Sequence, residues 1–111
     1  MTGGSVTSTD VTLGYDAGGT GTLNVTGGSV TNTTGYLGYE PGSVGTVTVS
    51  GSGTWANSGD LVVGLSGTGT LNVTGGYVSN TAGTLGSSAG SVGTATVSSG
   101  TWANSGGLTV G

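Results

Sequence analysis

The decapeptide GTGTLNVTGG occupies Gly19–Gly28 and recurs without change at Gly67–Gly76. Shifting the chain by half the interval between these two copies aligns Thr2–Thr22 with Thr26–Thr46 without a gap. The repeating unit is therefore about 24 residues long, a period within the range of known repeat architectures. Two kinds of unit alternate, one with TLNVTGG and the other with GTWANSG. Repetition of this kind is typical of solenoids, in which successive units stack on one another.

Apolar and polar residues alternate within each unit with the period of a β-strand, and no stretch has the helical spacing of i, i+3 and i+4. In TLNVT, Leu23 and Val25 face one side, whereas Thr22, Asn24 and Thr26 face the other. Glycine supplies 28 of 111 residues, and each interior glycine disfavours a helix by roughly 1 kcal/mol. The sequence therefore predicts an all-β protein.

Equivalent positions of successive units form four apolar columns. The columns are Leu23, Val47, Leu71 and Ala95; Val25, Val49, Val73 and Val97; Val6, Val30, Trp55, Val78 and Trp102; and Leu13, Leu37, Val63, Leu85 and Val110. One unit buries too few side chains to offset the backbone entropy of its own residues, so it cannot fold alone.

We predict a single domain over residues 1–111 that forms a parallel β-solenoid of about four to five coils, each of about 24 residues. Each coil is expected to contain two or three short strands. Gly27-Gly28 and Gly75-Gly76 are expected at corners, because glycine tolerates positive φ. Neither end of the sequence has an evident cap.

A column of asparagines also recurs once per unit, at Asn32, Asn57, Asn80 and Asn104. We expect an inward or corner ladder in which each amide bonds to the amides above and below it. The predicted role of this ladder is structural.

Trp55 and Trp102 stand in the column of Val30 and Val78, so large and small side chains alternate along the stack. We predict that both rings belong to the core, with space provided by the extra glycine in SGSGTW. The alternative is that the rings are exposed platforms for sugars.

Outward positions of the first strand in each unit are expected to build two ranks of small polar side chains on a flat face. The ranks contain Thr22, Asn24, Thr46, Thr48, Thr70, Asn72, Thr94 and Thr96. Similar T-x-T arrays occur in ice-binding solenoids, where spacings of about 4.7 Å across strands and about 7 Å along them can order water. The alternative is a solvated face without a ligand, since Thr is a good strand former.

The chain has no Lys, Arg, His or Cys, and its net charge is −4. Most acid–base, nucleophilic and metal chemistry lacks the side chains it needs, so we expect no enzymatic activity and no cofactor. Binding to nucleic acid requires cationic side chains, and a membrane span requires an apolar run of roughly 18 to 20 residues. We expect neither nucleic-acid binding nor membrane insertion.

Asp16 and Glu40 each follow a tyrosine and are one unit apart, so they should lie about 5 Å from each other. A Ca²⁺ ion that bridges them is one hypothesis. Like charges on a solvated edge are the simpler one, because the calcium repeat GGxGxD is missing from the sequence. We therefore predict no metal site.

The segment LGYEPGSVGTVTVSGSGTWANSGDLVVGLSGTGTLNVTGGYVSN resembles the repeats in passenger domains of type V secretion autotransporters and in PEP-CTERM-sorted surface proteins. The resemblance rests on GxGTLNVTGG, on GTWxNSGxLxVG and on the LG turns, and it covers essentially the entire chain. It implies a right-handed β-helix exported to the bacterial surface, as an adhesin or a matrix stalk, without catalytic residues.

Both ends of such a solenoid expose unpaired backbone groups and a slice of apolar core. We therefore expect self-association through the coil ends, head-to-tail into filaments. The leading hypothesis is a structural and adhesive extracellular module of the bacterial surface. The rival hypothesis is that the Thr/Asn face binds ice or polysaccharide.

Overall fold

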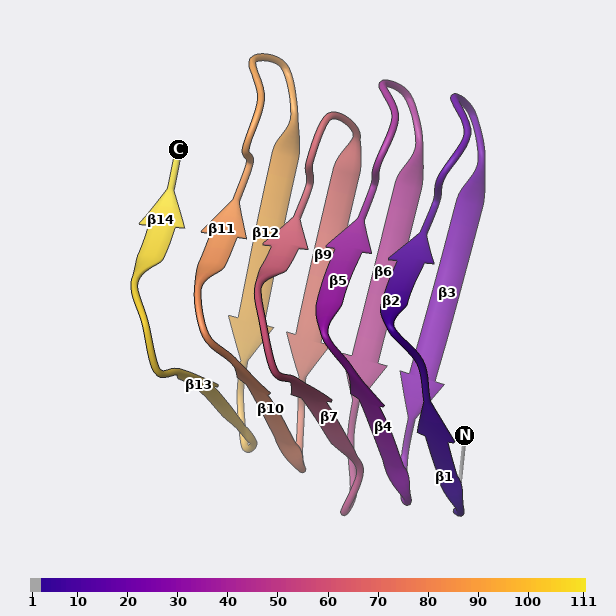
Figure 1. Cartoon of the computed structure of the whole chain (residues 1–111), viewed down its shortest axis with the longest axis vertical. Coiled ribbons are helices and arrows are strands. Elements are labelled where there is room, and N and C mark those ends of the chain that lie inside the picture. Colours follow the sequence, from indigo (N-terminus) through magenta and orange to yellow (C-terminus); the bar gives the residue numbers. More distant parts are fainter. Residues whose placement is uncertain (1–2) are drawn as a thin grey trace.

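The computed structural model describes residues 3–111, and these form fourteen β-strands and no helix, arranged in three parallel sheets (Figure 1). Sheet A contains β1 (Ser5–Thr7), β4 (Ser29–Asn32), β7 (Thr54–Asn57), β10 (Tyr77–Asn80) and β13 (Thr101–Asn104). Sheet B contains β2 (Asp10–Leu13), β5 (Thr34–Leu37), β8 (Leu61–Val63), β11 (Gly83–Leu85) and β14 (Leu108–Val110). Sheet C contains β3 (Thr20–Val25), β6 (Val44–Val49), β9 (Thr68–Val73) and β12 (Val92–Val97).

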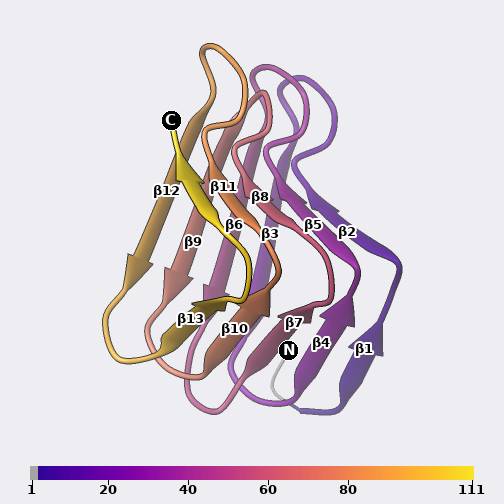
Figure 2. The ribbon, with the colours of Figure 1, turned by 60° about the vertical axis from the view of Figure 1, so that its left-hand side comes forward.

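Each coil runs from sheet C through sheet A to sheet B, and the next coil repeats the circuit beside it (Figures 1 and 2). Coil 1 comprises β3 to β5, coil 2 β6 to β8, coil 3 β9 to β11 and coil 4 β12 to β14, while β1 and β2 precede coil 1. The first strands, β1 and β2, and the last strands, β13 and β14, therefore lie at opposite ends of the stack (Figure 1). The prediction of an all-β parallel solenoid with the repeat length read from the sequence is confirmed.

The apolar columns stand in register along the sheets. In sheet C, Leu23 pairs with Val47, Val47 with Leu71 and Leu71 with Ala95. Sheet A aligns Val6, Val30, Trp55, Val78 and Trp102. Sheet B aligns Leu13, Leu37, Val63, Leu85 and Val110. The alternation of period two sends these side chains inward, where they form one continuous core.

The buried core lies in the middle coils. Its side chains are Val25, Val30, Leu37, Val47, Val49, Trp55, Leu61, Val63, Leu71, Val73 and Val78. The sequence columns omitted Leu61, which is fully buried. It belongs to a fifth inward column of sheet B, formed by Val11, Gly35, Leu61, Gly83 and Leu108.

Members of the columns near the ends are less buried than the sequence predicts. Leu23, Leu85 and Trp102 are only partly buried, and Val97 is 45% exposed. Val97 points inward from β12, but β12 is the last strand of sheet C and is covered on one side only. The prediction that Val97 is a core residue is therefore wrong.

Glycine is required where the circuit closes between sheets B and C. A Cβ on Gly45 would meet the amide nitrogen of Gly38 at 2.7 Å and the Cα of Leu37 at 2.9 Å. Gly21, Gly69 and Gly93 occupy the same position in their coils. At the predicted corners between sheets C and A, Gly28 and Gly76 have φ angles of 75° and 73°.

Candidate functional site

A hydrogen-bonded group of one tryptophan and two asparagines links coils 1 and 2 inside the core. Trp55 Nε1 donates to Asn32 Oδ1 at 2.6 Å, and Asn32 Nδ2 donates to Asn57 Oδ1 at 2.7 Å. Coils 3 and 4 repeat the arrangement, with distances of 2.6 Å from Trp102 to Asn80 and 2.7 Å from Asn80 to Asn104. These donors and acceptors satisfy one another within the protein, so the group is a structural element.

The asparagine ladder is interrupted between the two coil pairs, which corrects the prediction of an unbroken ladder. Asn57 Nδ2 donates to the backbone carbonyl of Ser79 at 3.2 Å instead of to the next amide. The pairing of β7 with β10 ends at Ala56 and Ser79, whereas the other sheet A steps that contain asparagine pair their asparagines directly. Asn57 and Asn80 are therefore out of bonding register.

Trp55 is fully buried, and Trp102 is half-buried in the last coil. The space for each ring comes from a glycine on the preceding coil, and not from SGSGTW as predicted. A Cβ on Gly35 would meet Cζ2 of Trp55 at 2.9 Å, and one on Gly83 would meet Cζ2 of Trp102 at 3.2 Å. Each coil that contains a tryptophan thus follows a coil that has a glycine in sheet B beneath the ring, Gly35 in coil 1 and Gly83 in coil 3.

The outer face of sheet C carries the two predicted polar ranks in register. One rank is Thr22, Thr46, Thr70 and Thr94, and the other is Asn24, Thr48, Asn72 and Thr96. The ranks are exposed in coils 1 and 4 and half-buried between them. A third rank, which the sequence analysis missed, contains Thr20, Val44, Thr68 and Val92, with Val44 37% and Val92 52% exposed.

None of the four Asp and Glu side chains of the chain lies on a strand of sheet C, and Asp16 and Glu40 lie in the turns that lead from sheet B to sheet C. Asp10 is the first residue of β2, Asp60 directly precedes β8, and Asp16 and Glu40 follow β2 and β5. Tyr15 and Tyr39 directly precede Asp16 and Glu40 in the sequence, and the ring of Tyr39 lies edge-on to both Tyr15 and Tyr36, with centroid distances of 4.9 and 5.2 Å. Within residues 3–111, no three of the possible metal-ligating side chains (His, Cys, Asp or Glu) gather into a site.

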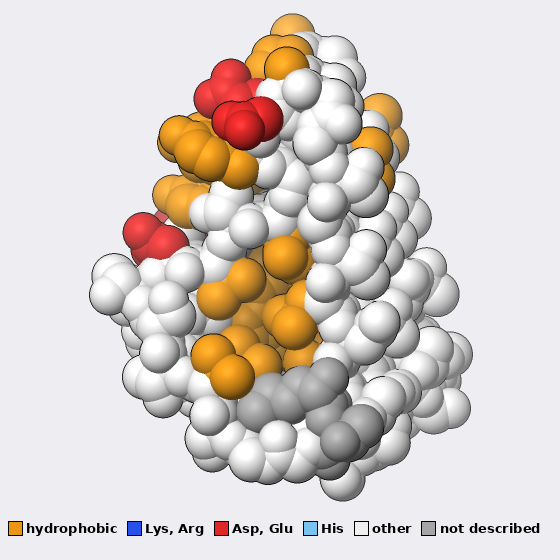
Figure 3. Space-filling model, turned by 90° about the vertical axis from the view of Figure 1, so that its right-hand side faces the viewer, with side chains coloured by type: hydrophobic (Ala, Val, Ile, Leu, Met, Phe, Trp, Pro, Cys, Tyr) orange, Lys and Arg blue, Asp and Glu red, His pale blue; other side chains and the backbone are white. Residues whose placement is uncertain are grey.

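Both ends of the stack expose inward-facing apolar side chains. Figure 3 looks onto the N-terminal end and shows hydrophobic side chains gathered at its centre inside a polar margin. Val6 is 48% exposed at this end, and Val11, Leu13 and Leu23 are partly covered. At the C-terminal end, Leu108 and Val110 are 49% and 72% exposed.

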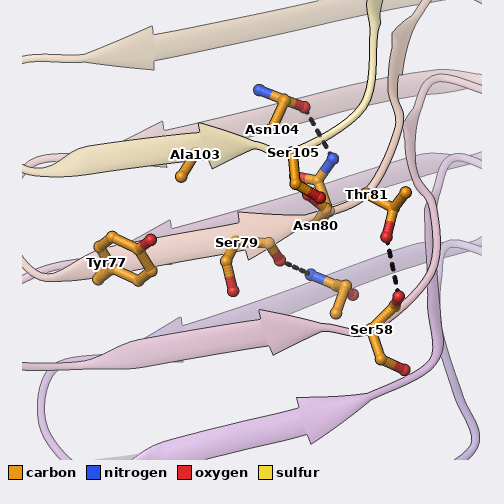
Figure 4. A pocket seen from close by; sticks show the side chains of 9 residues that line it. Ser58, Tyr77, Ser79, Asn80, Thr81, Ala103, Asn104 and Ser105 are labelled. Atoms are coloured by element: carbon orange, nitrogen blue, oxygen red, sulfur yellow. Dashed lines mark hydrogen bonds between the residues drawn. The ribbon is translucent and has the colours of Figure 1, made fainter.

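A hollow of about 340 Å³ opens on the outer face of sheet A, over coils 2 to 4 (Figure 4). Tyr77 stands at one side of it, and Ser79 and Ala103 are small side chains beside the ring. Ser58, Thr81 and Ser105 line the opposite side, where Thr81 Oγ1 donates to the carbonyl of Ser58 at 2.9 Å. None of the side chains that line the hollow is charged.

These features define a class, the parallel β-solenoid, here with buried asparagine and tryptophan side chains that hydrogen-bond to one another. Comparisons with protein-family models, with curated proteins and with solved structures found no match to this chain. No helix within residues 3–111 is long and apolar enough to cross a membrane.

Proposed function

We propose that this chain is a non-catalytic structural and adhesive module, exposed outside the cell or on a bacterial surface, that stacks end to end with further copies. The repeat identity that we propose is that of autotransporter passenger domains and PEP-CTERM-sorted surface proteins. The observation that carries the proposal is the open apolar cross-section at both ends of an otherwise continuous set of ladders. Unpaired strands of this kind are templates for pairing with another chain.

In this proposal, two copies meet in the register that successive coils have within one chain. Each sheet A strand aligns with its counterpart in the next coil, so β1 of a second copy is the natural continuation beyond β13. This places Val6 of the second copy on Trp102 and Thr7 of the second copy beside Ala103. In sheet B, β2 of the second copy follows β14, and Leu13 of that copy covers Val110.

This contact uses sheets A and B and leaves sheet C without a partner strand, because the first strand of sheet C follows β2 in the chain. It covers the apolar side chains that are most exposed at the two ends, and a fully buried Val or Leu side chain stabilises by about 1.5–3 kcal/mol. Because few residues take part in this end-to-end contact, we expect the associated fraction to increase with protein concentration.

The absence of native cysteine makes disulfide trapping a direct test of this register. In the double variant Thr7→Cys/Ala103→Cys the two Cα atoms of neighbouring copies lie about 4.8 Å apart, within the range of a disulfide. In the control Ser5→Cys/Ala103→Cys, the first cysteine lies two residues before position 7, about 7 Å further along the strand. The distance between the two Cα atoms is then too large for a disulfide. The second control, Ala103→Cys alone, would form a disulfide only if the C-terminal ends of two copies met.

We expect mild oxidation to convert Thr7→Cys/Ala103→Cys into covalent dimers and longer oligomers on a non-reducing gel, while both controls stay monomeric. Light scattering of the unmodified protein should show a mass that rises with concentration. Dispersed monomers at every concentration would contradict end-to-end stacking. Equal cross-linking of Ser5→Cys/Ala103→Cys would show that copies associate through their ends but not in the proposed register.

The second candidate function is binding of ice or polysaccharide by the sheet C face. The register of its ranks supports this candidate. No Asp or Glu lies on a strand of sheet C, so the array is both regular and uncharged. Thermal hysteresis and a glycan array test it. Any activity should disappear in Thr70→Lys on sheet C and persist in Thr31→Lys on sheet A, and a protein without either activity excludes the candidate.

A further inference from the structure

The hollow on sheet A lies where the repeat departs from itself. Gly19–Asn32 and Gly67–Asn80 have the same sequence except at two positions, where Ser29 and Thr31 are replaced by Tyr77 and Ser79. Both replacements line the hollow. One adds an aromatic ring and the other removes a methyl group beside it, so together they build a wall and deepen the floor.

The ring of Tyr77 does not serve the core. Tyr77 points outward from β10 in the rank of Ser5, Ser29, Thr54 and Thr101, all of which are small. It is 43% exposed, and no aromatic contact or hydrogen bond of its side chain is present among residues 3–111. A large exposed ring in a rank of hydroxyl residues is unnecessary for strand stacking, so it calls for a different explanation.

Apart from Asn57, Asn80 and Asn104, whose amides belong to the asparagine ladder, the other residues that line the hollow have hydroxyls or small side chains. Ser58 and Ser79 have hydroxyls that make no hydrogen bond within the described part of the chain, and so are available to a ligand as donors and acceptors. Ala103 keeps the floor low next to Ser79. Pockets with an aromatic wall and a few convergent polar groups are typical of small-molecule sites, and about 340 Å³ is within their usual range.

The chemistry of these groups selects the ligand. A phosphorylated or carboxylated ligand lacks a cationic partner, because the chain has no Lys, Arg or His and a net charge of −4. A purely apolar ligand would leave the hydroxyls of the hollow without partners, which costs free energy. A neutral sugar ring offers a C–H face for the tyrosine and hydroxyl groups for the serines and threonine.

We infer that the hollow beside Tyr77 is a subsite for one residue of a neutral polysaccharide. The hollow is open to solvent on the outer face of sheet A, so one residue of a longer glycan can enter it (Figure 4). This site goes beyond the proposed function, since it requires neither end-to-end stacking nor the sheet C face. An adhesive module would thereby hold a glycan on one wall while its ends join further copies.

The test uses three neutral hexasaccharides, cellohexaose, maltohexaose and hexa-N-acetylchitohexaose, with hexagalacturonate as the charged comparison. Binding is followed by chemical-shift changes in ¹H–¹⁵N spectra of the whole chain. We expect at least one neutral probe to bind in the millimolar range or tighter, with the largest shifts at Tyr77, Ser79 and Ala103, and hexagalacturonate to bind at least tenfold more weakly.

The variant Tyr77→Ser/Ser79→Thr restores the residues that the first copy of the repeat has at these positions, so it keeps a sequence that already folds in coil 1. We expect it to bind at least tenfold more weakly, while Tyr15→Ser, which lies in the turn after β2, binds as the unmodified chain does. The absence of shifts with every neutral probe at about 20 mM, well above a millimolar dissociation constant, overturns the inference. Unchanged binding by Tyr77→Ser/Ser79→Thr overturns it as well.

Discussion

Trp55 donates its indole N–H to the side-chain oxygen of Asn32 on the preceding coil, at 2.6 Å. Asn32 in turn donates to Asn57, which lies in the same coil as the tryptophan. The group therefore closes across two coils and is repeated in the next two. This explains why the strict sequence repeat spans two coils and not one: the pair of coils is the packing unit of the core.

The first prediction concerns this hydrogen bond. Trp55→Phe keeps an aromatic ring but leaves the buried oxygen of Asn32 without its indole donor, and an unsatisfied buried group costs about 1–3 kcal/mol. We expect the free energy of unfolding in urea to fall by at least that amount. Trp102→Phe should cost less, because Trp102 is only half-buried. Equal losses for the two variants would contradict the role assigned to the buried Trp55–Asn32 bond.

The second prediction concerns the space beneath the ring. A methyl group on Gly35 would lie 2.9 Å from Cζ2 of Trp55 and 3.0 Å from Cδ1 of Leu61, so Gly35→Ala overpacks the core and should destabilise by about 1–3 kcal/mol. Gly107→Ala is the matched control, because its Cβ would have no neighbour within 4 Å and its φ is not positive.

Adding Trp55→Val to Gly35→Ala tests the same contact through a double-mutant cycle. Removal of the ring relieves the clash, so the cost of Gly35→Ala should be smaller in the Trp55→Val background by about 1 kcal/mol or more. Additive losses in urea unfolding would show that the glycine and the ring are not coupled.

The sequence predicted the strand period, the length of the repeat and the four apolar columns, because each depends only on local alternation and on spacing along the chain. It missed the column of Leu61, since glycine at Gly35 and Gly83 hides an inward position from a search for apolar residues. It also could not show that strand pairing ends at Ala56 and Ser79, which breaks the asparagine ladder.

The candidate sites were predictable to different degrees. The polar ranks of sheet C follow from alternation alone, whereas the hollow beside Tyr77 joins side chains from three coils and depends on the small neighbours around the ring. Tyr77 and Ser79 do differ from Ser29 and Thr31 in an otherwise unchanged repeat. That difference was the available signal, and it becomes meaningful only when both positions are placed on one surface.

The third prediction concerns the C-terminal end. Val110→Lys should abolish concentration-dependent association, because stacking of a second copy would bury the ammonium group without a partner. The stability of the isolated solenoid should change little, since Val110 is 72% exposed. Thr109→Lys places the same charge on the outward side of the same strand and should leave association nearly intact. Sedimentation velocity distinguishes the two, and loss of association in both variants would point to net charge as the cause.

The fourth prediction uses the coil pair as a unit of insertion. A duplicate of residues 22–69 inserted after Gly69 adds one coil without tryptophan and one with it, so each ring still lies against a glycine on the preceding coil. In a solenoid each added unit contributes its own interface, and we expect a higher urea midpoint.

A duplicate of residues 22–45 inserted after Gly45 instead places two coils without tryptophan side by side. The space over the first Gly35 then has no ring to fill it, and the first Asn32 loses its indole donor. A cavity and an unsatisfied amide oxygen both oppose the gain from the extra coil. The urea midpoint of this protein should therefore be lower than that of the protein with the inserted pair, and the difference should be larger than the difference in length explains. Midpoints that rise in proportion to the number of added residues in both proteins would show that single coils, and not pairs, are the units that pack.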